Sequence, residues 1–214
     1  MKKYFFVLAL LISCLAMGFS VRTGKSTFMH PDSGNKSKDS VKDDANKFPP
    51  IEYSLKNGKS FSVLLLPESE YLYDVYITGN GFQESNDTIL FDEIEHVDTI
   101  ILADINNDGY EELYIFTKGF SPGAYDHVFG ITSDEDKSYK EINFDSLKPA
   151  DVIAGGVFDG YQGQDVYTLE NNLIKRTFPV YNAGDFYNSP SRGYRTLYYT
   201  LEKTDSGYYF ELKK

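Results

Sequence analysis

Hydrophobic and polar positions alternate along this chain in short runs that favour β-strands over helices. From residue 48 onward, runs of β-branched and aromatic residues are separated by clusters of Gly, Asn, Asp and Ser, and no window has a convincing helical period. The predicted strands are Ile51–Leu55, Ser60–Leu66, Tyr71–Thr78, Thr99–Ala103, Leu113–Lys118, Tyr125–Thr132, Asp165–Leu169, Leu173–Phe178, Tyr194–Glu202 and Tyr208–Leu212. Short strands at this spacing predict one all-β domain over residues 48–214, an antiparallel β-sandwich or a barrel-like sheet.

The N-terminal part of the chain differs from the rest and is predicted to lie outside this domain. Residues 1–20 begin with a positive pair, Lys2 and Lys3, and continue as an apolar run too short to span a membrane, which is typical of a secretory signal peptide. Residues 21–47 are rich in Ser, Lys, Asp, Asn and Gly. They carry too few apolar side chains to offset the entropy of ordering, so we expect a flexible linker.

Cys14, the only cysteine, bears on how the signal is processed. The segment from Leu11 to Cys14 resembles the bacterial lipobox, in which the cysteine is diacylated and becomes the mature N-terminus. The segment from Ala16 to Gly18 is an alternative small-x-small cleavage site. The sequence therefore predicts a bacterial cell-envelope protein, either a periplasmic or outer-membrane lipoprotein anchored through Cys14 or a secreted form without the anchor.

The net charge of −11 at pH 7 narrows the choice of partners. It argues against nucleic acid, which selects basic surfaces, and against an anionic lipid surface bound through a basic face. We therefore expect membrane contact only through the N-terminal lipid anchor. An acidic surface attracts cationic proteins and speeds their association, although acidity also serves solubility.

One polar loop between two apolar runs has the spacing of a calcium site. Asp104, Asn106, Asp108 and Glu112 fall at positions 1, 3, 5 and 9 of this loop, and Gly109 at position 6 lets the backbone fold back. Ca²⁺ takes about six to eight oxygen ligands around such a turn. The loop is not an EF-hand, because position 12 is isoleucine and both flanks are predicted strands. A polar hairpin turn has the same composition, so the sequence leaves both interpretations open.

The sequence favours a binding protein over an enzyme. The segment from Gly119 to Gly123 matches the Gly-x-Ser-x-Gly pattern of a hydrolase nucleophile. However, Pro122 follows the serine and has no N–H to donate to an oxyanion. The three histidines lack the spacing of a zinc site, and no carboxylate pair stands out as a glycosidase couple. We therefore predict no catalytic residues.

Five segments between Ile100 and Leu201, about half of the chain, form an ordered set of motifs. They are the Asp-rich hairpin Leu102–Ile115, the loop and strand Thr117–Ile131, the turn Gly160–Asp165, the segment Lys175–Asp185 and the motif Ser189–Leu197. In this order they resemble the periplasmic inhibitors of invertebrate-type lysozyme. The resemblance implies a β-domain that plugs the active-site cleft of a lysozyme with a protruding loop.

In that family the loop carries a Ser-Gly-x-Tyr motif, which falls here on the segment from Pro122 to Tyr125. Gly123 and Tyr125 match the motif, whereas Pro122 occupies the place of the serine and Ser121 lies one residue earlier. Without that hydroxyl, the position cannot donate to a catalytic carboxylate. The resemblance implies Ser121, Pro122, Gly123 and Tyr125 as partner-binding residues, with an invertebrate-type lysozyme or another cationic envelope protein as the partner.

An alternative function follows from composition and from the Asp-rich loop. Aromatic residues make up 16% of the chain, with 18 Tyr and no Trp, and an acidic surface rich in tyrosine is compatible with stacking on sugars. The alternative is a calcium-binding envelope module that recognises a glycan or a protein and inhibits nothing.

Overall fold

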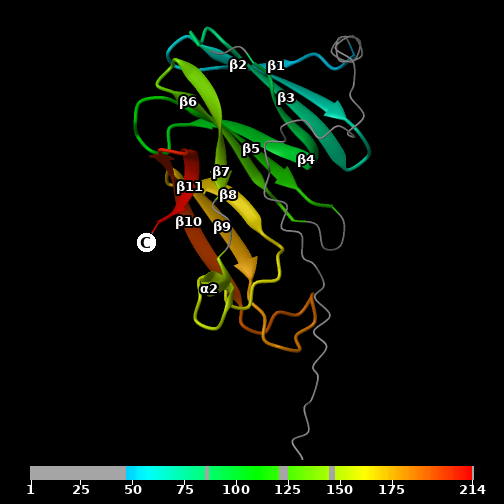
Figure 1. Cartoon of the computed structure of the whole chain (residues 1–214). Helices are drawn as coiled ribbons and strands as arrows, with labels where there is room; N and C mark the ends of the chain where they lie inside the picture. The colour runs from blue at the N-terminus through cyan, green and yellow to red at the C-terminus, as the bar shows by residue number, and fades with distance from the viewer. Residues whose placement is uncertain (1–46, 85–86, 121–124, 145–147, 214) are drawn as a thin grey trace, which may run out of the picture.

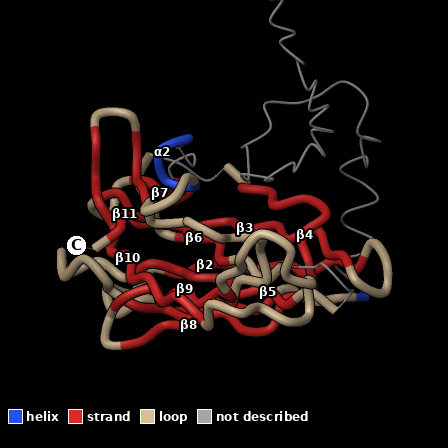
Figure 2. Tube along the Cα trace, turned by 90° about the horizontal axis from the view of Figure 1, so that it is seen from below, coloured by secondary structure: helices blue, strands red, loops and turns tan. Residues whose placement is uncertain are grey.

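A computed structural model describes residues 47–84, 87–120, 125–144 and 148–213. In these residues one 11-stranded sheet has the order β1-β2-β3-β4-β5-β6-β7-β11-β10-β9-β8 (Figure 1). Its elements are β1 (Ile51–Ser54), β2 (Ser60–Pro67), β3 (Leu72–Asn80), β4 (Ile89–Ala103), β5 (Glu112–Lys118), β6 (Val128–Asp134), β7 (Ser138–Phe144), the short helix α2 (Pro149–Val152), β8 (Val166–Glu170), β9 (Leu173–Pro179), β10 (Tyr194–Thr204) and β11 (Gly207–Leu212). Figure 2 shows that strands supply almost all of the regular structure, which confirms the predicted all-β, barrel-like fold.

The long strand β4 carries the chain from one half of the sheet to the other. It has 15 residues, of which the first part pairs with β3 and the second part with β5. The register shifts between Val97 and Thr99, where an irregularity of this kind bends a strand and increases its twist. The sheet curls as a result, with β1 to β3 at the top of Figure 1 and β8 to β10 in its lower part. Only β7 and β11 pair in parallel among the described strands.

The central strand β5 is buried on both of its faces. Every residue of Glu112–Thr117 is buried. Leu113 and Ile115 pack into a core with side chains of β2 and β3, whereas Tyr114 and Phe116 pack into a second core with side chains of β9, β10 and β11. Because side chains alternate along a strand, these two cores lie on opposite faces of the sheet. This double burial explains why β5 reads as a continuous apolar run.

The structure adds two stretches of strand to those predicted, β7 and the first half of β4. Sequence analysis missed these stretches because polar residues interrupt their apolar pattern. Lys140 and Glu141 interrupt it in β7, and Asp92 and Glu93 interrupt it in β4. In addition, β6 begins at Val128, three residues later than the predicted start at residue 125. The amide of residue 126 donates to a carbonyl outside β5, so this part of the predicted strand lies outside the ladder.

The helix α2 was also not predicted. It begins directly after Lys148 with Pro149 at its first turn, and the Asp151 carboxylate accepts a hydrogen bond from the Lys148 amide at 2.9 Å. These local signals start a helix that is too short for its period to be visible in the sequence. Residues 1–46, which include the predicted signal peptide and most of the predicted linker, lie outside the described residues.

Candidate functional site

The Asp-rich loop joins β4 to β5 as a tight turn that its own side chains hold. The Asp104 carboxylate accepts hydrogen bonds from the backbone amides of Asp108, with N to Oδ1 at 3.1 Å, and of Gly109, with N to Oδ2 at 3.0 Å. Asn107 and Gly109 adopt positive φ angles of 59° and 92°, which let the chain turn back. The loop therefore folds around the Asp104 side chain.

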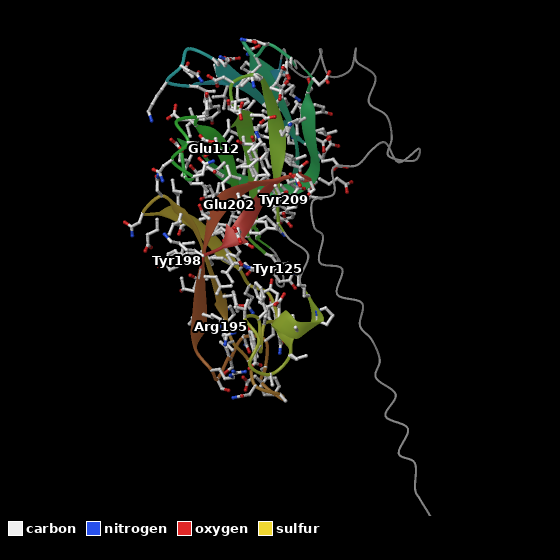
Figure 3. The ribbon with its side chains drawn as sticks, turned by 60° about the vertical axis from the view of Figure 1, so that its left-hand side comes forward. Glu112, Tyr125, Arg195, Tyr198, Glu202 and Tyr209 are labelled. Carbon is white, nitrogen blue, oxygen red and sulfur yellow. The ribbon has the colours of Figure 1, made fainter. Side chains whose placement is uncertain are left out.

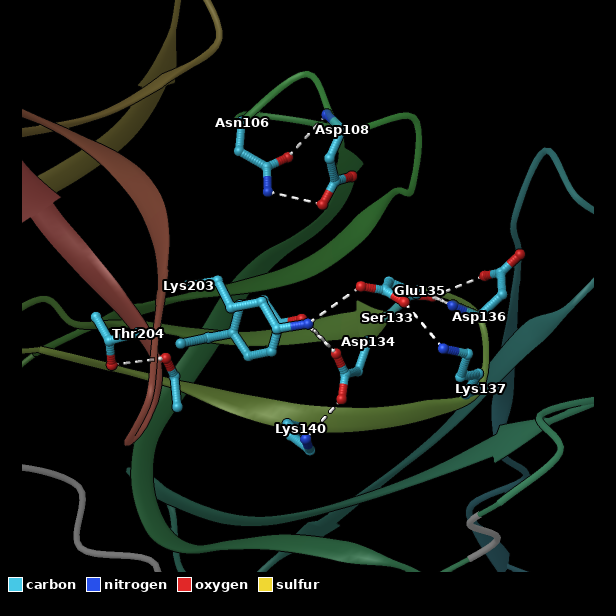
Figure 4. Close-up of polar contacts among 12 residues, drawn as sticks. Asn106, Asp108, Ser133, Asp134, Glu135, Asp136, Lys137, Lys140, Lys203 and Thr204 are labelled. Atoms are coloured by element: carbon cyan, nitrogen blue, oxygen red, sulfur yellow. Dashed lines mark hydrogen bonds and ion pairs between the residues drawn. The ribbon is translucent and has the colours of Figure 1, made fainter.

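The four predicted cation ligands come together at this turn. Asp104, Asp108 and Glu112 offer carboxylate oxygens within 4.8 Å of one another. Asn106 lies beside them: its Nδ2 donates to Asp108 Oδ2 at 2.8 Å, and its Oδ1 accepts from the Asp108 amide at 3.2 Å (Figure 4). The group consists entirely of hard oxygen donors, which are the ligands that Ca²⁺ prefers.

Glu112 differs from the other carboxylates because it is fully buried, with 0% of its surface exposed. Its Oε2 accepts hydrogen bonds from the Ile105 amide and from the Tyr114 hydroxyl, both at 3.1 Å. Its Oε1 is also buried and has no hydrogen-bond partner among the described residues. Burial is the main cause that raises the pKa of Glu112 to about 8, and the nearby charges of Asp108 and Asp104 add to the rise.

Tyr125, the predicted partner-binding tyrosine, packs against a glycine far along the chain. A Cβ added at Gly163 would lie 1.8 Å from Tyr125 Cε1, so only glycine allows this packing. The next residue, Asp126, donates its backbone amide to the Asp165 carbonyl oxygen at 3.3 Å. The Tyr125 side chain is half-buried and lies near the middle of the molecule in Figure 3. The ring of Tyr125 is therefore held against the turn that contains Gly163.

A buried ion pair holds the turn on which Tyr125 rests. Arg176 Nε lies 2.6 Å from Asp165 Oδ1, and both side chains are almost completely buried. The guanidinium lies over the ring of Phe158, at 4.8 Å from its centroid, and over the ring of Tyr161 at 5.1 Å. The Tyr161 hydroxyl donates to the second Asp165 oxygen. The charge on Arg176 is thus paired and surrounded by aromatic faces, which makes its burial tolerable.

The same turn also contacts the segment that follows β9. Gln164 Nε2 donates to the Tyr181 hydroxyl at 2.7 Å and to the Tyr187 carbonyl oxygen at 2.8 Å, and the Tyr181 hydroxyl donates to that carbonyl at 2.7 Å. Burial, and after it the nearby Tyr125 phenol, raises the pKa of Tyr187. The sequence holds no spacing signal that pairs Tyr125 with Gly163 or Arg176 with Asp165, so sequence analysis missed both pairs.

Large aromatic side chains in the segments that precede Tyr125 and follow β9 are exposed. Phe120 is 58% exposed, and one edge of its ring contacts the ring of His96 at a centroid distance of 5.3 Å. Phe186 is 79% exposed and Tyr187 is 40% exposed. Exposed aromatic side chains are typical of the anchor residues of protein interfaces.

Several predicted site residues lie outside the described residues. They are Cys14, Ser121, Pro122 and Gly123. Among the residues that the structure does describe, no helix is long and apolar enough to cross a membrane.

A groove of about 570 Å³ beside the Asp-rich loop was not predicted from the sequence. Three separate elements line it: the Asp-rich loop, the turn between β6 and β7, and the hairpin of β10 and β11 (Figure 4). Lys203 reaches across from β10, with its Nζ 2.9 Å from Asp134 Oδ1 and 3.3 Å from Glu135 Oε1. Exposed Glu202 lies at the same groove, close in sequence to Lys203.

Comparison of this chain with protein-family models, with curated proteins and with solved structures found no match.

Proposed function

We propose that this chain is an exported cell-envelope binding protein of the kind that inhibits invertebrate-type lysozyme, and that the loop from Gly119 to Tyr125 enters the lysozyme cleft. The observation that carries the proposal is the packing of Tyr125 against Gly163. These two residues belong to different segments of the resemblance to lysozyme inhibitors, and nothing in their spacing requires them to meet.

Two further segments of the resemblance lie at the same place. Tyr181, in the fourth segment, accepts the hydrogen bond from Gln164 at 2.7 Å. Arg192, in the fifth segment, approaches so closely that a Cβ at Gly160 would lie 2.9 Å from its Nη1. Three other segments of the resemblance thus meet at the turn on which Tyr125 packs, and a side chain held in place before binding loses little entropy on binding.

The surroundings of the loop fit a protein partner of basic character. Exposed Phe120 and Phe186, in segments that flank Tyr125 in the sequence or follow β9, offer apolar area to a partner. The net charge of −11 would attract a cationic lysozyme and raise its rate of association. A loop presented by a rigid β-sheet is a common way to fill an enzyme cleft.

Inhibition of invertebrate-type, chicken-type and goose-type lysozymes by the purified protein tests the proposal. We expect Tyr125→Ala to weaken binding by about 2 kcal/mol or more, a factor of about 30. Tyr125→Phe keeps the ring over Gly163 and isolates the contribution of the hydroxyl. Tyr71→Ala removes a tyrosine that is 51% exposed and lies outside the five segments, so it serves as the control and should leave binding unchanged.

Pro122→Ser restores the Ser-Gly-x-Tyr motif and should strengthen binding, because the new hydroxyl can donate to a catalytic carboxylate. If neither the wild type nor Pro122→Ser inhibits any of the three lysozymes, the inhibitor function is wrong. The alternative is then a calcium-binding envelope module that recognises a glycan or another protein without inhibiting it.

We also propose that the protein is anchored to the membrane through Cys14. Metabolic labelling with palmitate should label the wild type and leave Cys14→Ser unlabelled. A mature N-terminus at Phe19, or equal labelling of the two proteins, would contradict an anchor at Cys14.

A further inference from the structure

We propose that Asp104, Asp108 and Glu112 hold a Ca²⁺ ion, with Asn106 as a further oxygen donor, and that this ion ties together contacts from both halves of the sheet. The site lies at the opposite end of β5 from the loop that we propose to bind lysozyme. The inference therefore goes beyond the proposed function and does not depend on it.

The spread of the carboxylate oxygens matches the size of a calcium ion. Ca²⁺–O distances are about 2.3–2.6 Å, so two oxygens on opposite sides of one ion lie about 4.6–5.2 Å apart. The three carboxylates offer oxygens within 4.8 Å of one another. Mg²⁺ demands near-ideal octahedral geometry and keeps several of its waters, so a group of protein side chains that closes around one ion favours Ca²⁺. The absence of nitrogen and sulfur from this ligand group favours a hard cation over a transition metal.

The unpartnered oxygen of Glu112 is the second, independent observation that points to a bound ion. Glu112 Oε1 is buried without a hydrogen bond in the described part of the chain, while Oε2 already accepts from Ile105 and Tyr114. Buried carboxylate oxygens are normally satisfied by a donor or a metal. A proton could neutralise Glu112, but Asp104 and Asp108 would still face each other close by. A divalent cation compensates all three carboxylates at once.

Contacts from both halves of the sheet converge on this turn. From the turn between β8 and β9, Asn172 Nδ2 donates to the Asp104 carbonyl oxygen at 2.6 Å. From the turn between β1 and β2, the Lys56 amide donates to Glu111 Oε2 at 2.9 Å, and Lys56 Nζ lies 2.9 Å from Glu111 Oε1. Glu111 directly precedes Glu112, so an ion that fixes Asp104 and Glu112 also fixes the positions that these two turns contact.

Thermal unfolding of the purified protein in Ca²⁺, in Mg²⁺ and in chelator tests the proposal. Calcium sites of extracellular modules bind with a Kd of about 10⁻⁴–10⁻³ M, so about 1 mM Ca²⁺ should raise Tm by about 1–6 °C. Mg²⁺ should raise it by clearly less. Equal Tm values in Ca²⁺ and chelator would overturn the site, and an equal rise with Mg²⁺ would overturn its assignment to calcium.

Glu112→Gln gives the sharpest version of this test, because it removes the charge and keeps the shape. In chelator the variant should melt at or above the wild-type temperature, because the Gln amide oxygen can still accept from Ile105 and Tyr114 and its NH₂ group can donate to the neighbouring carboxylates. In Ca²⁺ it should lose the calcium-dependent rise in Tm. Glu202→Gln makes the same change of charge at the groove beside the loop, and it should keep the rise. A full rise in Glu112→Gln would contradict the proposal.

Terbium luminescence offers a readout that is independent of stability. The chain contains 18 Tyr and no Trp, and the Tyr114 hydroxyl lies 3.1 Å from Glu112 Oε2. Excitation of tyrosine should therefore sensitise Tb³⁺ bound at this site, and Ca²⁺ should displace it. We expect Asp108→Asn to reduce the signal and Glu202→Gln to leave it intact. Luminescence that neither Asp108→Asn nor Glu112→Gln reduces would place the ion elsewhere and overturn the proposal.

Discussion

The loop that enters β5 and the loop that leaves it carry the two candidate sites of this chain, and different kinds of contact hold them. The Asp-rich loop closes on itself, because the Asp104 carboxylate binds the amides of Asp108 and Gly109 four and five residues later. At the other end of β5, Tyr125 packs instead against Gly163, in a turn that belongs to a different part of the chain. Local contacts of the first kind can be deduced from spacing, whereas contacts of the second kind appear only once the chain has folded.

The largest difference between the two sites should appear in the stability lost when one glycine at each site is replaced by alanine. Gly163 has φ +92°, and a Cβ there would lie 1.8 Å from the Tyr125 ring. Gly163→Ala combines an unfavourable backbone conformation with a severe overlap, so we expect it to lower the free energy of unfolding by about 3 kcal/mol. Denaturant-induced unfolding of the variant and the wild type measures this loss.

Gly109→Ala is the matched change in the Asp-rich loop. Gly109 also has φ +92°, but nothing lies within 4 Å of an added Cβ, so only the backbone cost of about 1–2 kcal/mol remains. Gly184, with the same φ and the same open surroundings, provides a control outside both loops. Equal losses in Gly163→Ala and Gly109→Ala would show that the ring of Tyr125 does not rest on Gly163.

A double-mutant cycle between Tyr125 and Gly163 tests the packing of these two residues directly, and its expected effect is smaller. In a Tyr125→Ala background the overlap disappears, so Gly163→Ala should cost only about as much as Gly109→Ala. The coupling energy between positions 125 and 163 should therefore be about 1–2 kcal/mol. The same unfolding measurements on the double variant give this energy, and strict additivity would contradict the packing.

These contrasts explain how much of the molecule the sequence could predict. Alternating apolar runs predicted most strands, and oxygen-bearing side chains at loop spacing predicted the group of Asp104, Asn106, Asp108 and Glu112, because both signals are local. Sequence analysis missed β7 because polar side chains interrupt its pattern. The groove beside the Asp-rich loop was missed for another reason: its walls come from elements that the sheet order brings together.

The sequence also did not indicate how deeply Glu112 is buried. Glu112 looked like one of four loop ligands, but the covering of both faces of β5 leaves it fully buried, with an oxygen that has no hydrogen-bond partner in the described part of the chain. Its special position follows from two cores that meet on one strand, and each core draws on residues from distant parts of the chain. The residue types that form this site can therefore be read from the loop sequence. The burial of Glu112, which sets the electrostatics of the site, depends on the whole sheet.

The last predicted effect, similar in size to the coupling energy, uses pH to test a buried carboxylate in the sheet beside the Asp-rich loop. Glu141 on β7 is a second carboxylate whose pKa burial raises, to about 7 from an ordinary value of 4.5, but it lies outside the group of predicted cation ligands. The folded protein retains the proton of Glu141 at pH values where the unfolded chain has lost it. The resulting stabilisation is fully present below about pH 4.5 and is lost as the pH rises through about 7.

Comparison of the wild type with Glu141→Gln at constant calcium concentration isolates this contribution. Because part of the Glu141 side chain remains in contact with water, we expect the wild type to lose only about 1–2 kcal/mol relative to the variant between pH 5 and pH 8. Glu202→Gln, at an exposed position, makes the same change of charge and should leave the pH dependence of the wild type unaltered. If the difference between wild type and Glu141→Gln stays constant over this range, burial does not hold the proton on Glu141, and the pH dependence of folding must be sought in the Asp-rich loop instead.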